Sequence, residues 1–248
     1  MDFESEDARL HYELNGPDGG APIVLVHGFA SDYQLNWVGT RWQETLTGAG
    51  YRVIGLDCRG HGSSEKPHDP AAYALDVMAA DVRRLLDHLD IRVADYLGYS
   101  MGARIGVEAM LDWPDRLRHV VLGGVGSGGA FHAADEIARA LRGQPTSSAV
   151  AKTFYDFAAA RQSNDLEALA ACILGPQSEP DPSRLRSIKN PVLVVVGEQD
   201  DIVDEVPRLV ESIPTARLVT VPGRNHMSTV PAREFKQAVI EFLGETST

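Results

Sequence analysis

The sequence predicts an α/β protein in which a mostly parallel, twisted sheet carries helices on both faces. Short apolar runs alternate with amphipathic segments along most of the chain, and two of the clearest runs are PIVLV at 22–26 and PVLVVV at 191–196. Strands that are apolar throughout are buried on both faces, which is typical of parallel sheets. No strand pattern occurs between about 125 and 189. This interval predicts a small helical cap inserted into the sheet domain.

The elements follow from hydrophobic periodicity and from the turn residues between them. The predicted strands cover 9–14, 22–26, 51–56, 93–99, 117–122, 191–196 and 216–221. The predicted helices of the main body cover 34–47, 73–89, 103–111, 206–212 and 232–243. We therefore expect a core domain made of 1–124 and 190–248, and a cap made of 125–189.

Three short helices are predicted within the cap, at 133–141, 147–160 and 165–174. Asn164 is followed three residues later by Glu167, which indicates a capping box at the start of the third helix. The proline-rich tract 176–187 is expected to be a linker back to the core.

Composition restricts the class of protein. The chain has 248 residues, a net charge of −12 and two cysteines. The acidic charge argues against nucleic acid or an anionic membrane as a partner. Low cysteine usage provides no disulfide framework and favours a reducing compartment. The acidic N-terminus lacks an apolar segment, and no run reaches the ~18 apolar residues of a membrane span. We expect a cytoplasmic protein with a small-molecule substrate.

The stretch Gly98-Tyr99-Ser100-Met101-Gly102 lies between a predicted strand and a predicted helix. A serine on such a sharp strand-to-helix turn has strained backbone angles and projects its hydroxyl from the apex. Glycine is needed on both sides because a Cβ would clash where strand and helix converge. The G-x-S-x-G pattern therefore favours Ser100 as a nucleophile. The alternative is a glycine-rich loop that only joins the two elements.

Other reactive side chains also follow predicted strands. Ligands of such sheets bind beyond the carboxyl ends of the strands. Asp200 and Asp201 follow the strand 191–196, and His226 follows the strand 216–221. A serine needs a histidine to take its proton, and the histidine needs a carboxylate to hold its tautomer.

Five segments together resemble the α/β-hydrolase superfamily over nearly the whole chain: HGF (27–29), DCRGHGSS (57–64), GYSMG (98–102), GEQDDIV (197–203) and GRNHM (223–227). The resemblance implies that fold, with Ser100 as nucleophile and His226 as general base and then general acid. It also implies an oxyanion hole formed by the backbone N–H groups of Phe29 and Met101. No cofactor and no metal are expected.

The same resemblance distinguishes Asp200 from Asp201 as the catalytic acid. The family's acid lies three residues after the glycine that ends the strand and three before a valine, and Gly197 and Val203 both point to Asp200. Asp201 is the alternative. His27 and His61 belong to motif loops, and we expect them to form structural hydrogen bonds.

The substrate pocket is expected to include Phe29, Tyr99, Met101 and His132, of which His132 opens the cap. Packing beneath the turn is an equal alternative for Tyr99. A serine nucleophile, unlike an aspartate, favours attack on a carbonyl carbon. The expected activity is carboxylic-ester hydrolysis of small to medium acyl substrates (EC 3.1.1-like). The alternatives are a C–C bond hydrolase or acyltransferase with the same triad, or a slow-turnover ligand receptor on this fold.

Overall fold

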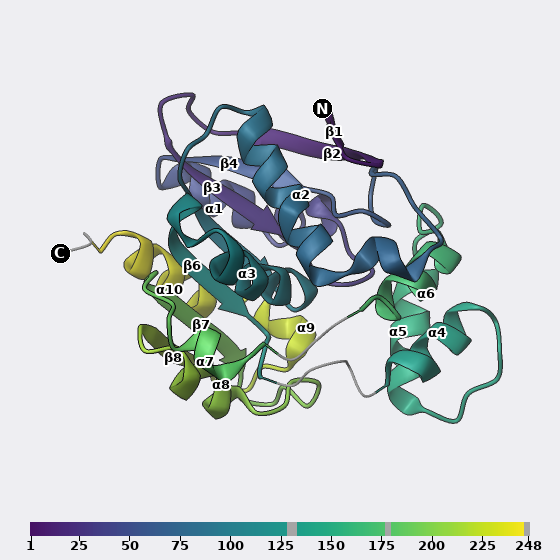
Figure 1. Ribbon diagram of the computed structural model, residues 1–248. Coiled ribbons are helices and arrows are strands. Elements are labelled where there is room, and N and C mark those ends of the chain that lie inside the picture. The colour runs from purple at the N-terminus through teal and green to yellow at the C-terminus, as the bar shows by residue number, and fades with distance from the viewer. Residues whose placement is uncertain (128–132, 177–179, 246–248) are drawn as a thin grey trace.

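An eight-stranded sheet forms the centre of the molecule, as the computed structural model of residues 1–127, 133–176 and 180–245 describes it (Figure 1). The strand order is β1-β2-β4-β3-β5-β6-β7-β8. The strands are β1 (Asp2–Ser5), β2 (Ala8–Asn15), β3 (Ala21–Val26), β4 (Tyr51–Leu56), β5 (Ala94–Tyr99), β6 (Leu117–Gly123), β7 (Val192–Gly197) and β8 (Ala216–Val221). Strand β2 pairs antiparallel with both β1 and β4, and the described strands from β3 to β8 are mutually parallel. The predicted mostly parallel sheet is confirmed.

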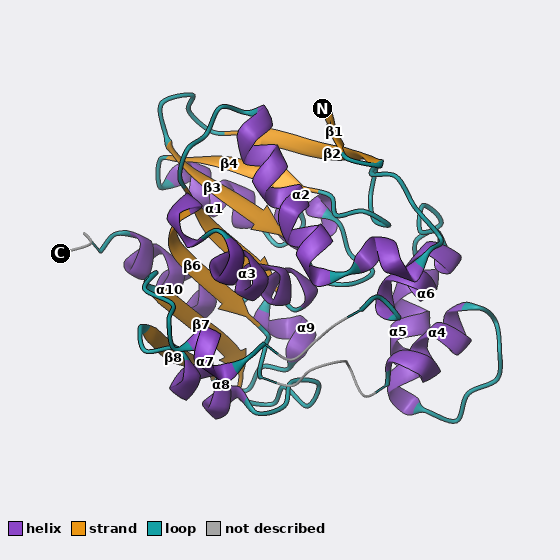
Figure 2. Ribbon diagram, viewed as in Figure 1, coloured by secondary structure: helices purple, strands orange, loops and turns teal. Residues whose placement is uncertain are grey.

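Helices cover both faces of the sheet (Figure 2). On one face lie α2 (Leu75–His88), α3 (Met101–Asp112) and α8 (Val206–Ser212), and on the other lie α1 (Trp42–Gly48) and α10 (Arg233–Leu243). An apolar core lies on each face of the sheet, and successive side chains of a strand point alternately into one core and the other. In β3, for example, Val24 and Val26 pack on the α2 and α3 side, whereas Ile23 and Leu25 pack against α1 and α10.

The C-terminal part of the chain is attached to the N-terminal part on the second face. The indole Nε1–H of Trp42 donates to the carbonyl of Val230 at 2.8 Å, between residues 188 positions apart. The Trp42 ring also contacts Phe235 edge-on, with ring centroids 4.8 Å apart. Helix α10 and the segment before it are therefore positioned by contacts with α1, whereas β8 is positioned by pairing with β7.

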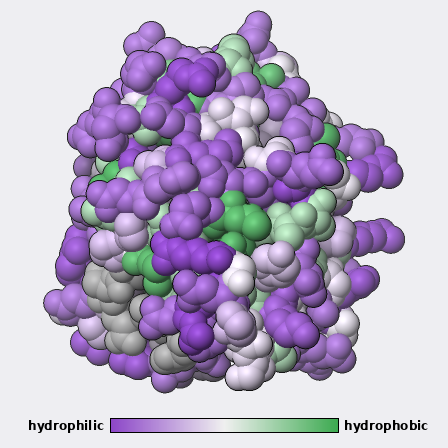
Figure 3. Space-filling view, turned by 90° about the vertical axis from the view of Figure 1, so that its right-hand side faces the viewer, coloured by the Kyte–Doolittle hydropathy of each residue, from purple (hydrophilic) through white to green (hydrophobic). Residues whose placement is uncertain are grey.

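Between β6 and β7, the residues that the structure describes form four helices: α4 (Ala134–Leu141), α5 (Ala149–Ala159), α6 (Leu166–Ile173) and α7 (Pro182–Leu185). The first three gather beyond the carboxyl ends of the parallel strands, toward which the arrowheads point in Figure 1. Figure 3 views the molecule from this side, which is mostly hydrophilic with an apolar area near its middle. The expected division into a core domain and a cap remains a prediction.

Several local expectations were wrong. The single helix at 34–47 is divided into a π-helical turn, η1 (Gln34–Val38), and α1, because Arg41 adopts a φ of 65°. Asp165, rather than Asn164, is the N-cap of α6. Helix α7 lies within the expected linker, where Asp181 caps it and Pro182 begins it. Strand β1 was missed because its acidic residues face solvent while Phe3 and Ser5 are buried.

Short helical segments complete the chain: η2 (Pro70–Tyr73), η3 (Pro114–Arg116) and α9 (His226–Thr229). Within the described ranges, no helix combines the length and the apolar character that crossing a bilayer requires.

Candidate active site

Ser100 lies at the junction of β5 and α3 in a strained conformation, with φ 53° and ψ −111°. The two flanking glycines are required by close backbone contacts. A Cβ on Gly102 would lie 2.1 Å from the carbonyl oxygen of Val26, and one on Gly98 would lie 2.3 Å from that of Gly102. The N–H of Ser100 donates to the carbonyl of Gly123 at 2.8 Å, which fixes the turn to β6. The sharp strand–turn–helix geometry expected from the sequence is present.

His226 and Asp200 form a buried pair. Nδ1 of His226 lies 2.8 Å from Oδ2 of Asp200, and their side chains are 7% and 0% exposed. The other carboxylate oxygen accepts the N–H of Ile202 at 3.2 Å. Because Nδ1–H donates to the carboxylate, Nε2 is the nitrogen left with a lone pair. Asp201 is exposed, and in the described part of the chain it has no hydrogen bond to His226.

Residues adjoining Ser100 contact His226. The hydroxyl of Tyr99 donates to the carbonyl of His226 at 2.5 Å, and the two rings lie 5.3 Å apart. A Cβ on Gly124 would lie 3.0 Å from Cε1 of His226. Tyr99 is 2% exposed and packs near Phe235 below the turn. These contacts show that Tyr99 packs beneath the turn, and its place in the substrate pocket remains a prediction. The close contact of Gly124 with His226 was not predicted from the sequence. The only sign of it there is the Gly123-Gly124 pair at the end of a predicted strand.

The loop after β3 lies beside Ser100. A Cβ on Gly28 would lie 3.5 Å from the Cβ of Ser100. Among the described residues the N–H of Phe29 has no hydrogen-bond acceptor. Met101 is the first residue of α3, where an N–H has no partner within the helix. Two backbone donors therefore lie close to Ser100, one on each side of the nucleophile turn.

Two buried histidines hold this loop. Nε2 of His27 accepts the N–H of Cys58 at 3.0 Å, and its Nδ1–H donates to the carbonyl of Gly28 at 2.8 Å. Nε2 of His61 accepts the N–H of Ala30 at 3.1 Å. Burial lowers the pKa of both, that of His61 to about 3, so both rings are neutral at pH 7. The expectation that they form structural hydrogen bonds is confirmed.

The cap helices contribute apolar contacts to the same region. The rings of Phe29 and Phe154 lie 5.9 Å apart, and Sγ of Cys172 lies 3.8 Å from Sδ of Met101. Phe29 and Met101 are each 8% exposed. His132 lies outside the described residues. The described side chains include no group of three or more His, Cys, Asp or Glu arranged to hold a metal ion.

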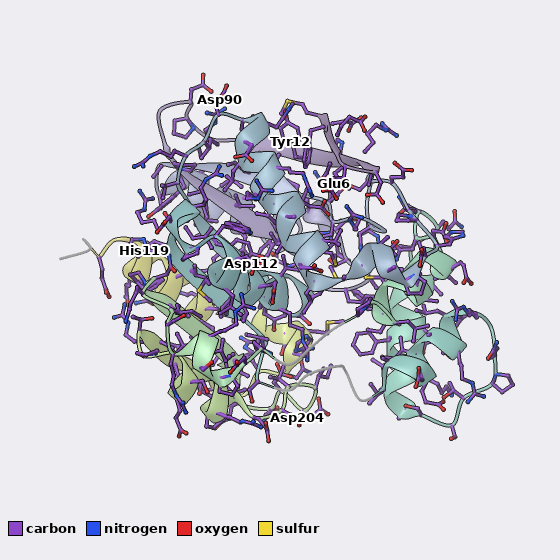
Figure 4. All side chains as sticks on the ribbon, viewed as in Figure 1. Glu6, Tyr12, Asp90, Asp112, His119 and Asp204 are labelled. Carbon is purple, nitrogen blue, oxygen red and sulfur yellow. The ribbon has the colours of Figure 1, made fainter. Side chains whose placement is uncertain are left out.

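A second buried histidine–carboxylate pair lies elsewhere. Nδ1 of His119 is 3.0 Å from Oδ1 of Asp95, and both side chains are nearly inaccessible. These residues belong to the starts of β6 and β5, at the opposite end of the strands from Ser100. In Figure 4 His119 lies on the side of the sheet away from the cap helices, whereas Asp204, in the loop after β7, lies on the side toward them. Ligands of parallel sheets bind at the carboxyl ends, so His226 and not His119 belongs to the candidate site.

Comparison with known proteins decides the family. The family model described as the alpha/beta hydrolase fold matches residues 21–145. The chain belongs to the alpha/beta hydrolase fold family. The resemblance seen in the sequence is thereby confirmed, and so is the α/β fold class.

Three relatives illustrate the range of this family. The 2-hydroxy-6-oxononadienedioate/2-hydroxy-6-oxononatrienedioate hydrolase 2 of Pseudomonas putida is 30% identical, over 96% of this chain and 92% of that protein. The enol-lactonase of Burkholderia xenovorans LB400 is 25% identical with a TM-score of 0.82, covering 99% of this chain and 100% of that one. A thermophilic esterase of Thermogutta terrifontis is 26% identical with a TM-score of 0.80, covering 98% and 97%. The chain is therefore an enzyme of the hydrolase type.

Proposed function

We propose that this hydrolase attacks a carbonyl carbon of a small molecule with Ser100, using His226 as base and Asp200 as its orienting acid. The observation that carries the proposal is the buried hydrogen bond of 2.8 Å between His226 Nδ1 and Asp200 Oδ2, next to a serine in the strained conformation of a nucleophile turn. A serine hydroxyl is a weak nucleophile until a positioned base removes its proton.

The reaction proceeds in two halves. Nε2 of His226 takes the proton as Oγ of Ser100 bonds to the carbonyl carbon, and Asp200 stabilises the imidazolium that forms. The N–H groups of Phe29 and Met101 donate to the developing oxyanion. The imidazolium then gives its proton to the leaving group, which departs and leaves an acyl-enzyme. Water attacks this intermediate by the same route in reverse and releases the acid.

A carboxylic ester of small to medium size is the substrate class we favour. The esterase and the enol-lactonase among the relatives support this chemistry. The contacts of Phe29 and Met101 with Phe154 and Cys172 provide apolar surroundings that suit an uncharged acyl group. Arg161 and Asp32 beside this loop form an ion pair, in which their charges compensate each other.

Cleavage of a carbon–carbon bond beside a ketone is the second candidate. It is supported by the Pseudomonas putida relative, the most similar of the three in sequence. The compounds in that protein's name carry a 6-oxo group and no ester, so their hydrolysis breaks a carbon–carbon bond. The same serine, histidine and aspartate would serve, with a carbanion-type leaving group taking the proton in place of an alkoxide.

Labelling with a fluorophosphonate tests the shared mechanism. The reagent is expected to modify Ser100 and to abolish turnover, and Ser100→Ala is expected to lose labelling and at least about 10³-fold in kcat. A label on another residue, or full turnover by Ser100→Ala, would sink the proposal.

Two substrates separate the candidates. A p-nitrophenyl ester series from acetate to laurate is compared with a 2-hydroxy-6-oxo-2,4-dienoate followed by its absorbance. Higher kcat/KM on the esters supports the favoured class. Turnover of the dienoate alone selects carbon–carbon cleavage instead.

A further inference from the structure

The loop that carries Phe29 is fixed on its core side by its immediate neighbours. The N–H of Gly28 donates to Oδ1 of Asn36 at 3.1 Å, and the N–H of Ala30 donates to Nε2 of His61 at 3.1 Å. Between these two donors, the N–H of Phe29 has no hydrogen-bond acceptor among the described residues. Its direction depends on the conformation of residues 28–32.

The same loop is held from the cap side by the segment between α5 and α6. Nη2 of Arg161 forms an ion pair with Oδ2 of Asp32. Nδ2 of Asn164 lies 2.9 Å from the carbonyl of Ala158 and 3.5 Å from that of Ala30. Asn164 therefore anchors the segment to the end of α5 and directs it toward the loop. These contacts join residues about 130 positions apart in the chain.

Asp32 connects this ion pair to the core. Its Oδ1 accepts the N–H of Leu35 at 2.7 Å, at the start of η1, while Oδ2 faces Arg161. The Asp32 side chain is 7% exposed and that of Arg161 is 30% exposed. A nearly buried carboxylate that loses its cation is unfavourable, so Asp32 would turn toward water if Arg161 were removed.

Ala30 makes the loop sensitive to such a change. Its φ of 57° lies in the left-handed region, which a residue with a Cβ adopts only where surrounding contacts impose it. Two of those contacts are the N–H bond to His61 and the carbonyl contact with Asn164. Loss of the contacts from the cap would allow the backbone of Ala30 to relax. The backbone of the preceding Phe29 would rotate with it, and the Phe29 N–H would change direction.

We propose that Arg161 is a positioning residue of the oxyanion hole. Through Asp32 it holds residues 28–32 in the conformation that aims the Phe29 N–H at the reacting oxygen. Transition-state stabilisation thereby requires the segment 161–164 of the cap to be docked on the loop. This inference rests on the proposed function of Ser100.

The rate at which a fluorophosphonate modifies Ser100 reports how well the oxyanion hole stabilises negative charge, because the phosphoryl oxygen occupies the place of the oxyanion. The measurement does not require the natural substrate. Arg161→Met is expected to lower this rate and kcat on a p-nitrophenyl ester by about 10- to 100-fold, since small misplacements of a catalytic group have such effects. KM is expected to change by less than about threefold, because the interaction forms mainly in the transition state. Arg161→Lys is expected to restore most of the rate.

A matched control lies within the cap itself. Arg142, which follows the last residue of α4, pairs with Glu167 of α6 at 2.8 Å, and its described side-chain hydrogen bonds do not reach the loop. Arg142→Met is expected to keep the wild-type rate. Asp32→Asn retains an acceptor for Leu35 and is expected to lose as much rate as Arg161→Met. The double variant Arg161→Met/Asp32→Asn is expected to lose no more than either single one, because both remove the same contact.

Several outcomes would overturn the inference while the proposed function stands. One is wild-type labelling of Ser100 in Arg161→Met, and another is an equal loss in Arg142→Met, which would assign the effect to cap stability. A rise in KM without a change in kcat would assign Arg161 to substrate binding. If Arg161→Met does not fold, Asp32→Asn provides the same comparison. Absence of labelling at Ser100 in the wild-type protein would instead overturn the proposed function.

Discussion

At the scale of single residues, the choice between Asp200 and Asp201 has a geometric basis. Asp200 points its buried carboxylate at Nδ1 of His226, while the neighbouring Asp201 is exposed. The sequence limited the candidates for the proposed catalytic acid to these two adjacent positions. It distinguished them only through the spacing of a family pattern, because both side chains carry the same chemistry.

Asp200→Asn is expected to lower kcat by about 10³- to 10⁴-fold, since the amide leaves the imidazole in the wrong tautomer. Asp201→Asn is the matched control one residue away and is expected to stay within about twofold of wild type in steady-state kinetics. Equal losses in the two variants would contradict the assignment of the acid.

Gly102→Ala tests the nucleophile turn. The added methyl would lie 2.1 Å from the carbonyl oxygen of Val26, so the turn must shift. We expect a loss of about 1–3 kcal/mol in the free energy of unfolding, together with slower labelling of Ser100. Gly48→Ala is the control, because its Cβ would meet nothing within 4 Å at the end of α1. Chemical denaturation that places both variants at the same midpoint would refute the steric argument.

At the scale of elements, the sequence predicted regular segments better than their interruptions. Apolar runs such as 51–56 and 216–221 became β4 and β8 with the same limits. The division of the helix at 34–47 could not be predicted, because Arg41 is an ordinary helix former and its residue type gives no sign of a φ of 65°. The cap of α6 was misplaced by one residue because Asn164 and Asp165 are both good N-caps.

Asp165→Ala is expected to destabilise α6. Oδ1 of Asp165 accepts the N–H groups of Glu167 and Ala168, each at 3.0 Å, and the loss of an N-cap costs about 1 kcal/mol. Burial alone would raise the pKa of Asp165, but the bonds from Ala168, His68 and Glu167 outweigh it and lower the pKa. The contribution is therefore complete above the unfolded carboxyl pKa of about 3.9 and disappears as pH falls through the lower folded value.

Urea unfolding at pH 7 and at pH 3 measures this difference. Asp156→Ala removes an exposed carboxylate from the middle of α5 and is expected to be neutral. A cost for Asp165→Ala that is the same at both pH values would rule out the charged N-cap.

At the scale of the whole molecule, the sequence marked the proposed reacting groups but not the contacts that position them. Ser100, Asp200 and His226 stand out because each follows an apolar run typical of a strand. Such a pattern is visible in a single sequence. The Arg161–Asp32 pair and the bond from Tyr99 to His226 join residues 129 and 127 positions apart. No periodicity or local motif marks such pairs, since they depend on how the cap and the C-terminal segment dock.

The buried neutral histidines predict acid sensitivity of the whole fold. The pKa of His61 is about 3 in the folded state because burial disfavours its charged form, against about 6.5 when unfolded. Between these values the unfolded chain binds more protons, so the free energy of unfolding falls as pH is lowered below about 6.5, by up to about 1.4 kcal/mol per pH unit for one histidine.

Urea titrations between pH 7 and pH 4 check this slope, and His61→Gln is expected to reduce it. His88 is exposed, and its ring nitrogen contacts the uncharged hydroxyl of Tyr12, so His88→Gln serves as the control. An unchanged slope in His61→Gln would show that His61 does not carry the effect.

The attachment of α10 and Val230 to Trp42 also concerns how the protein is made. During synthesis Ser100 and its turn emerge long before Asp200 and His226, and β7 and β8 must still pair with the sheet at β6. The hydrogen bond from Trp42 to Val230 joins residues 188 positions apart, so it can form only after β7 and β8 have been synthesised. A growing chain therefore carries the proposed nucleophile without its proposed base, and hydrolytic activity is expected to begin only after His226 and the residues that attach it to the sheet have been synthesised.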